Sequence, residues 1–335
     1  MTKILGILLA LVLVTVATAW NTESFLTPYN VKNLLNWIGL FGVISLGAAF
    51  VIIGGGIDLS IGSVVGLSAC LLPWLLVKQG LSPWVGIPLV LAACAAIGLL
   101  HGVLITFVKL QPFVVTLCGL LCYRGLARWF TDDKEMGFGQ GFTGLRDLVK
   151  SSVNLPIGGT VYYIPTTFLL MVALALAAAF LLNLTVAGRH LKAVGRNEQA
   201  ARYSGVITPR VVIFSYVICS TAAGLGGMLF ALDLNSVQPA GFGNFYELYA
   251  IAAAVIGGCS LRGGEGSVLG VVAGVAIIRL LFNSINLMGF PSQLEFAVIG
   301  LVILAGVLAD TALLKLAAWN RRRQERLRAA RDGHP

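Results

Sequence analysis

The chain has 335 residues, of which 58% are apolar and only 11% are charged. Soluble domains carry about 25% charged residues, and a folded soluble chain of this size cannot bury so much apolar side chain. The composition therefore excludes a water-soluble enzyme and indicates a membrane protein. The net charge of +9 is better explained by basic residues in cytoplasmic loops than by a nucleic-acid partner.

Ten apolar segments follow one another along the chain, and most are long enough to cross a bilayer as helices. They are Ile4–Trp20, Leu34–Ile53, Ile57–Val77, Pro83–Val108, Phe113–Phe130, Ile164–Val186, Val211–Leu232, Tyr246–Gly258, Ser267–Leu287 and Leu294–Leu316. The eighth is short enough to be a broken or re-entrant segment. The sequence predicts an all-α polytopic membrane protein of about ten transmembrane helices, built as one domain over residues 1–335.

The first segment has two interpretations. Lys3, the apolar stretch after it and Ala17-Thr18-Ala19 are typical of a secretory signal peptide with its cleavage site. The alternative is a retained first helix, which we favour because no soluble domain follows. In both cases the chain beyond Trp20 begins outside the membrane.

The distribution of Lys and Arg predicts the orientation. With an inside N-terminus and ten spans, most basic residues fall in the cytoplasm, including the tail Arg321–Arg331. We therefore expect both termini in the cytoplasm and a basic cytoplasmic tail over residues 320–335.

Two connections are long. The outer one, residues 131–163, is expected to lie outside the membrane and to hold a short helix around Thr143–Val149. The inner one, residues 187–210, is strongly basic.

A weak internal sequence similarity links the stretches Val51–Gly66 and Val255–Gly270. Each is a Gly-rich break between two apolar helices, and the similarity suggests a duplicated unit.

Several kinds of catalytic site are missing from the sequence. It has no GxxxxGK[ST] loop for a nucleotide and no His, Cys or carboxylate cluster with metal-ligand spacing. Ionisable residues within the spans are expected to be isolated, which also argues against a membrane-embedded enzyme. We expect no catalytic residues, no cofactor and no metal in this chain, and we interpret its six cysteines as packing residues.

A Gly-rich turn separates the second and third segments. Three successive glycines should end one helix, and Asp58 then stands where the N-cap of the next helix belongs. A structural cap is the simpler interpretation, and a contact at a cytoplasmic gate or partner surface is the alternative. The residues of interest are Gly54, Gly55, Gly56, Asp58, Ser60 and Gly62.

The inner connection is predicted to contain a small capped helix. Asn197 suits its N-cap, Glu198 its first turn and Gly205 its C-terminal end. The helix lacks an apolar face for packing on its own bundle, so Ala200, Ala201 and Tyr203 should be displayed to a groove on another protein. A loop that merely caps itself is the alternative.

Four stretches in chain order resemble the permease subunits of bacterial ribose-type ABC sugar importers, within the branched-chain amino acid/ribose permease superfamily. They are Gly54–Ser63, Gln111–Gly125, Asn197–Val206 and Ala254–Gly270, and together they span most of the chain.

The resemblance implies a ten-helix permease of the bacterial inner membrane that translocates a monosaccharide, a ribose-like pentose or a hexose. It also implies that the outer connection, residues 131–163, is a periplasmic loop. It implies several partners: two ABC ATPase domains that use the ATP, a second permease copy or paralogue, and a periplasmic sugar-binding protein. The permease itself would be surrounded by membrane lipid. The resemblance also implies an ATPase-coupling role for the inner connection, with Gly195, Asn197, Glu198, Ala200, Ala201 and Gly205 as its residues.

An ion- or proton-coupled secondary transporter is the alternative function. It would need a buried carboxylate or a broken-helix ion site. Asp58 and Glu265 are the candidates, and both are expected at the cytoplasmic rim.

A polar stripe marks the ninth segment. Arg279, Asn283 and Asn286 stand at i, i+4 and i+7, on one helix face. They either line a sugar path or join helices, with Arg279 paired to Glu295 or Glu247. Candidate mouth residues precede the eighth segment: Asn235, Gln238, Phe242 and Phe245.

Overall fold

The computed structural model describes residues 2–291 and, beyond them, Leu294, Ala297, Gly300, Leu301, Leu304 and Trp319, with side chains from residue 11 onward. Within this part, seven helices are long and apolar enough to cross a membrane. They are α2 (Pro28–Ile53), α3 with its π-helical continuation (Ile61–Pro73 and Trp74–Lys78), α4 (Pro83–Thr106), α5 (Pro112–Thr131), α7 (Thr166–Leu184), α10 (Thr208–Leu234) and α12 (Val268–Leu287).

Two further apolar helices, α1 (Thr2–Asn21) and the shorter α11 (Tyr246–Ile256), complete the bundle in the described residues. The first nine predicted segments each coincide with one of these helices, and the polytopic helical class is confirmed. The tenth segment, Leu294–Leu316, lies almost entirely outside the described residues, as does the tail 320–335. The number of spans therefore stays a prediction.

Proline placement explains where several helices begin. Each of α2, α4, α5 and α10 has a proline in its first turn, where the missing N–H has no helical partner to lose. In α2 the hydroxyl of Thr27 also accepts from the N–H of Asn30. These local signals explain why the apolar segments could be bounded from sequence within a few residues.

The interior of the bundle is organised around α10. This helix packs on α4, α2 and α3, while α7 packs chiefly on α2. In the most apolar 18-residue stretch of α2, 89% of the residues are buried, whereas only 17% are buried in the corresponding stretch of α7. The first is a core helix, and the second stands at the edge of the bundle.

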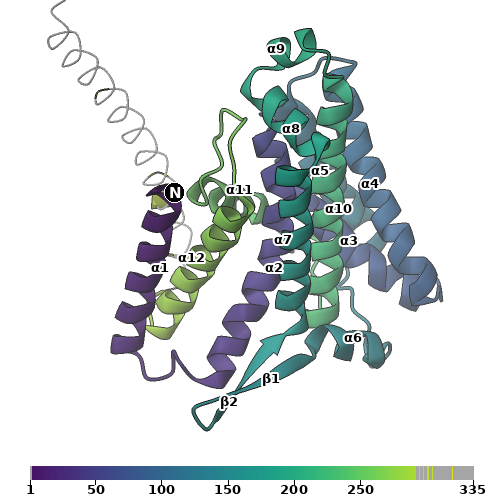
Figure 1. Cartoon of the computed structure of the whole chain (residues 1–335). Helices are drawn as coiled ribbons and strands as arrows, with labels where there is room; N and C mark the ends of the chain where they lie inside the picture. The colour runs from purple at the N-terminus through teal and green to yellow at the C-terminus, as the bar shows by residue number, and fades with distance from the viewer. Residues whose placement is uncertain are drawn as a thin grey trace, which may run out of the picture.

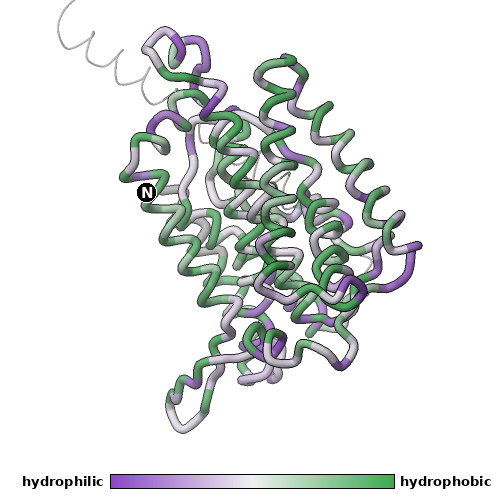
Figure 2. The backbone as a smooth tube through the Cα atoms, turned by 90° about the vertical axis from the view of Figure 1, so that its right-hand side faces the viewer, coloured by the Kyte–Doolittle hydropathy of each residue, from purple (hydrophilic) through white to green (hydrophobic). Residues whose placement is uncertain are grey.

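The two ends of the bundle differ (Figure 1). One end carries α8 (Val186–Arg196) and α9 (Glu198–Tyr203); the other carries α6 (Thr143–Lys150) and a hairpin of β1 (Ser152–Ile157) and β2 (Thr160–Pro165). Figure 2 shows hydrophobic residues along the helices and most hydrophilic residues toward the two ends, as expected for a chain that spans a bilayer.

The outer connection is only partly as expected. The helix predicted around Thr143–Val149 is confirmed as α6, but the antiparallel hairpin was missed. Its strands are joined by Gly158 and Gly159, with Ile157 paired to Thr160. A Gly-Gly pair between two short β-prone runs is a hairpin signal and could have revealed it. The all-α class describes the membrane region, and the hairpin is an addition outside it.

The cysteines follow the packing interpretation in part. Cys70, Cys94, Cys219 and Cys259 are buried and free, and burial raises the pKa of the Cys259 thiol to about 11. Two others, Cys118 and Cys122, are exposed on α5, so for them the interpretation as packing residues of this chain is wrong.

Candidate functional site

Two helices begin inside the bundle rather than at its ends. Helix α3 starts after the non-helical residues 54–60, and α11 starts after the largely non-helical residues 235–245. The predicted break at the eighth segment is thereby confirmed. A Cβ at Gly62 would overlap the carbonyl oxygen of Gly243 and the carboxylate of Glu247. The beginnings of α3 and α11 are thus in direct contact, although they are far apart in sequence.

Each of these helix starts holds a buried carboxylate. Asp58 precedes α3 and is 2% exposed, and Glu247 lies in the first turn of α11 and is 7% exposed. Helix N-termini carry partial positive charge, which stabilises a nearby anion. The region is therefore able to hold acidic groups away from water.

The predicted role of Asp58 needs two corrections. Its Oδ1 accepts from the N–H of Ser60 at 2.8 Å and from the Ser60 hydroxyl at 2.6 Å, and Ser60, not Asp58, is the N-cap of α3. Asp58 is also buried inside the bundle instead of lying at a rim. The reason is the glycine turn: Gly54 ends α2, and the chain then folds back inward, with Gly56 against the Tyr216 hydroxyl.

Further polar side chains surround Asp58 and form what we term the central polar cluster: Asp58, His101, Tyr123 and Tyr216. Asp58 interacts electrostatically with His101 and Tyr216. The Tyr123 hydroxyl lies 2.8 Å from His101 Nε2, and the Tyr216 hydroxyl donates to the Ile57 carbonyl at 3.4 Å. Asp58 also interacts with the Cys219 thiol of α10, and His101 Nδ1 has no hydrogen-bond partner among the described residues. The expectation of isolated ionisable groups is wrong, because α4, α5 and α10 bring them together.

Arg124 was missed as a site residue. Its guanidinium donates to the carbonyl oxygens of Phe242 and, at 3.1 Å, Pro239, and it interacts electrostatically with Glu247. It thereby joins α5 to the irregular segment before α11. Phe242 is half-buried against Tyr246, whereas Phe245 is 47% exposed.

The polar stripe on α12 divides between two environments. Asn283 and Asn30 of α2 exchange hydrogen bonds of 2.7 and 3.1 Å, whereas Asn286 is exposed. Arg279 lies 3.6 Å above the ring of Phe41. These contacts are those of helix packing and favour that alternative, while a sugar path along the stripe stays a prediction. Glu247 faces Arg124, and Glu295 lies outside the described residues. The other rings near Arg279 are Trp37, Tyr249 and Phe282.

The capped helix on the inner connection is confirmed as α9. The Asn197 side chain accepts from the N–H of Ala200 at 2.9 Å. Glu198 accepts from the Thr208 hydroxyl at 3.1 Å, and Gly205 follows the helix with φ of 85°. Ala200 and Tyr203 are exposed, but Ala201 is only 5% exposed. Its predicted display is wrong, because α9 packs on α8 and α10.

Helix α8 ends against both Gly-rich breaks, at what we term the glycine junction: Gly55, Gly195, Gly263 and Gly264. A Cβ at Gly195 would overlap the Ile53 carbonyl oxygen and lie 2.6 Å from the Gly264 nitrogen. That nitrogen donates to Ile53 at 2.8 Å, and a Cβ at Gly263 would lie 2.8 Å from the Gly55 Cα. Only glycine permits backbones to approach this closely.

The comparisons with known proteins agree with this architecture. Residues 30–307 match the family described as "Branched-chain amino acid transport system / permease component". The chain is 38% identical to the ribose import permease protein RbsC of Bacillus subtilis (strain 168), covering 91% of this chain and 92% of that protein. It is 34% identical to RbsC of Escherichia coli (strain K12), covering 90% and 92%. It is 31% identical to the D-allose transport system permease protein AlsC of the same strain, covering 91% and 90%. No solved structure matches it significantly.

Proposed function

Because this multi-pass membrane protein belongs to the branched-chain amino acid transport system permease family, we propose that it is the permease subunit of an ABC importer for a monosaccharide. The observation that carries the proposal is the similarity to a ribose import permease over nearly the full length of both chains. Other relatives are named for D-allose and xylose, so a ribose-like pentose or a hexose is the substrate class that these names support.

The orientation follows from charge. Exposed arginines gather at the α8–α9 end, and basic residues favour the cytoplasmic side. We therefore assign this end to the cytoplasm of a bacterium and the hairpin end to the periplasm, with the chain in the inner membrane and both termini cytoplasmic. The exposed arginines are Arg189, Arg196, Arg202 and Arg210.

The partners follow from the proposed role as the permease subunit of an ABC importer. Two ABC ATPase domains contact α8 and α9 and hydrolyse the ATP, a periplasmic sugar-binding protein delivers the substrate at the hairpin end, and a second permease copy or paralogue completes the membrane part. The exposed Tyr203, at 90%, and Ala200 supply α9 with a contact surface for an ATPase.

The glycine junction supplies a route for coupling. Its contacts join backbone to backbone, so side-chain rotamers cannot absorb a displacement of α8. Movement of α8 and α9 therefore reaches the end of α2 and the turn between α11 and α12 directly. Both lead to the broken helices, where α3 and α11 meet, and a shift there changes the packing of the bundle interior.

The test is uptake by reconstituted proteoliposomes. We expect labelled ribose, D-allose or xylose to accumulate only when the ATPase, ATP and the binding protein are all present. Omission of any one should reduce uptake to the level of empty vesicles.

A second candidate, an ion- or proton-coupled transporter, is favoured by one observation. Asp58 and Glu247 are buried carboxylates at broken-helix starts, which is the kind of site that such transporters use. Sugar uptake by this chain alone, driven by a proton or sodium gradient, would establish that candidate and overturn the importer proposal.

A further inference from the structure

The segment between α10 and α11, residues 235–245, enters the membrane region without forming a helix. Its outer end lies at the hairpin end of the bundle, where Val237 pairs with Met136 of the outer connection. Further along, Gly243 packs against Gly62 at the beginning of α3. At a rise of about 1.5 Å per residue, Gly62 lies about 24 Å from the outer end of α3 and its π-helical continuation. The segment therefore descends to the middle of a hydrocarbon core about 30 Å thick.

One side of this segment is fixed to the bundle. Arg124 of α5 donates to the carbonyl oxygens of Pro239 and Phe242. A Cβ at Gly66 of α3 would lie only 2.8 Å from the same Phe242 oxygen, so the two backbones are in close contact. The segment is therefore a defined part of the bundle and not a loose loop.

The other side of the segment is open. Ala240, Gly241 and Asn244 are exposed, and Phe245 is 47% exposed. A Cβ at Gly241 would meet no other atom of the described chain within 4 Å. Irregular backbone with an exposed amide side chain cannot face lipid, because lipid supplies no hydrogen bonds. At membrane depth such backbone occurs only where protein covers it or where it lines a water-filled cavity.

Helix α5, on which the segment rests, differs from the lipid-facing helices. Only 28% of the residues in its most apolar 18-residue stretch are buried, and the figure for α7 is 17%. Among the seven long apolar helices of the described residues, α7 is the most apolar and α5 the least apolar. A helix exposed to lipid should be strongly apolar, so the composition of α5 agrees with water beside the segment.

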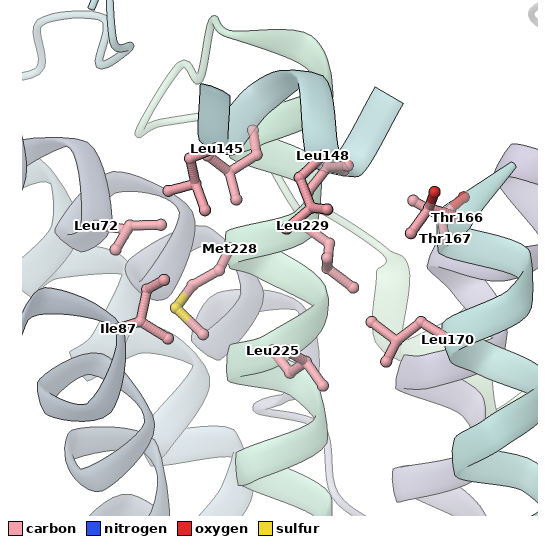
Figure 3. Close-up of a pocket in the computed structure, with 12 residues that line it drawn as sticks. Leu72, Ile87, Leu145, Leu148, Thr166, Thr167, Leu170, Leu225, Met228 and Leu229 are labelled. Carbon is pink, nitrogen blue, oxygen red and sulfur yellow. The ribbon is translucent and has the colours of Figure 1, made fainter. Parts of the chain in front are cut away.

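The cavity in Figure 3 is not suited to a sugar. It belongs to an apolar groove between α7 and α10, which holds cavities of about 310 and 340 Å³, and Leu225 lines both. Figure 3 shows mainly leucine, isoleucine and methionine side chains around the first cavity. Its two threonines already have partners, since Thr167 donates to Asn36 at 2.6 Å and the Thr166 hydroxyl bonds to Ser151. The groove therefore offers a sugar far fewer hydrogen-bonding groups than the open side of residues 235–245.

We propose that the open side of residues 238–245 lines the outer, water-filled half of the sugar path. This inference rests on the proposed function, and it assigns the path to this segment instead of the stripe on α12. The exposed amides of Gln238 and Asn244 donate to and accept from the hydroxyl groups of the passing sugar. The water-filled half ends in the middle of the membrane, where Gly243 closes against Gly62.

Water access to the segment can be measured with a negatively charged methanethiosulfonate, because only a thiolate reacts and a thiol in hydrocarbon stays protonated. The full chain, with Cys118 and Cys122 changed to serine, is embedded in vesicles opened so that the reagent reaches both membrane faces. Asn244→Cys is compared with Leu176→Cys, the matched control, which lies near the middle of α7 and is 68% exposed. Asn244→Cys should react at least about tenfold faster, because lipid suppresses the thiolate by more than that.

Two results would overturn the assignment. One is an equal reaction rate at the two positions, which would show that the segment has no more access to water than a lipid-facing helix. The other is an unreactive Asn244→Cys that forms a disulfide-linked dimer, which would show that a second copy covers the segment. If Asn244→Cys does not insert into the membrane, Ala240→Cys decides, because Ala240 is exposed on the same segment.

Uptake measurements separate this inference from the function on which it rests, since the labelling needs neither sugar nor ATPase. In the reconstituted importer, modification of Asn244→Cys should reduce sugar uptake severalfold, and the same treatment of Leu176→Cys should leave it unchanged. Normal ATP-driven uptake together with an unreactive Asn244→Cys would preserve the importer and overturn the path. A reactive Asn244→Cys in a chain without sugar uptake would overturn the importer and support a water-filled path for another solute.

Discussion

Single polar residues link neighbouring helices across the bundle. Tyr123 of α5 pairs with His101 of α4, and Asn283 of α12 pairs with Asn30 of α2. Within a membrane, an unpaired polar group cannot form hydrogen bonds with water. Each pair therefore favours the helix arrangement that keeps it together over arrangements that would separate it. These polar pairs therefore affect both which helices become neighbours and how stable the bundle is.

Removal of one partner should expose this effect at the central polar cluster. Tyr123→Phe leaves His101 Nε2 buried without its hydroxyl partner, and we expect a loss of about 1–3 kcal/mol in unfolding free energy. Denaturant unfolding in detergent micelles measures it. Tyr203→Phe removes the same hydroxyl at a 90% exposed position and should cost almost nothing. Equal stability of the two variants would contradict the assignment.

The stripe on α12 can be resolved by a double-mutant cycle. If Asn283 packs helices, Asn283→Leu and Asn30→Leu should each destabilise the chain. The pair should then be non-additive by at least about 0.5 kcal/mol. Asn286→Leu is the matched control, because Asn286 is exposed, and it should change neither stability nor uptake. Impaired sugar uptake in Asn286→Leu with unchanged stability would instead favour a path along the stripe.

Among the structural elements, α8 and α9 form a rigid connection rather than a loose loop. Asn197 caps α9, Thr208 binds Glu198, and α8 touches both Gly-rich breaks at the glycine junction. A rigid element transmits a displacement that a flexible one would absorb. We therefore expect coupling to be most sensitive to substitutions in α8, α9 and the glycine junction.

The glycine junction gives a direct test of transmission. Gly195→Ala forces α8 away from Ile53 and Gly264, and overpacking of this kind typically costs about 1–3 kcal/mol. We expect ATP-driven uptake to fall severalfold while membrane insertion persists. Gly144→Ala is the control, since a Cβ there meets no neighbouring atom. Wild-type uptake in Gly195→Ala would show that the junction does not carry the motion.

The capped helix gives a second test. Gly205→Pro demands a negative φ where the chain has 85°, and Glu198→Lys removes the acceptor for Thr208. Both should allow ATP hydrolysis to continue without uptake, measured together in proteoliposomes, while insertion remains intact. Gln199→Lys adds a charge to the same helix at an exposed position and separates loss of the cap from a charge effect. Fully coupled transport in both variants would rule out the assigned role of α9.

At the scale of the whole molecule, the bundle has a hairpin end and an α8–α9 end with different surroundings. The two ends lie on opposite sides of the membrane in our assignment. The basic residues of the α8–α9 end identify that end as the cytoplasmic one. With Cys118 and Cys122 replaced by serine, a membrane-impermeant maleimide should label Tyr203→Cys only in inverted vesicles. It should label Thr160→Cys, an exposed position on β2, only in intact spheroplasts. Labelling of both from one side would contradict the topology.

The sequence by itself determined the membrane class, nine helical segments, the short helix α6 and the cap of α9. These features depend on hydropathy over about twenty neighbouring residues or on a cap within three or four, and such signals are complete within one stretch of chain. The hairpin was missed although its Gly158-Gly159 turn is also a local signal.

Only the tertiary structure decided the rest. It buried Asp58 and Ala201, set Arg124 beside Glu247, joined α3 to α11 at Gly62 and Gly243 and left the groove between α7 and α10 open. Each of these facts depends on which distant segments become neighbours, and no short window of residues contains that information. Packing among helices, where small residues let backbones meet and polar groups must find partners, supplied it.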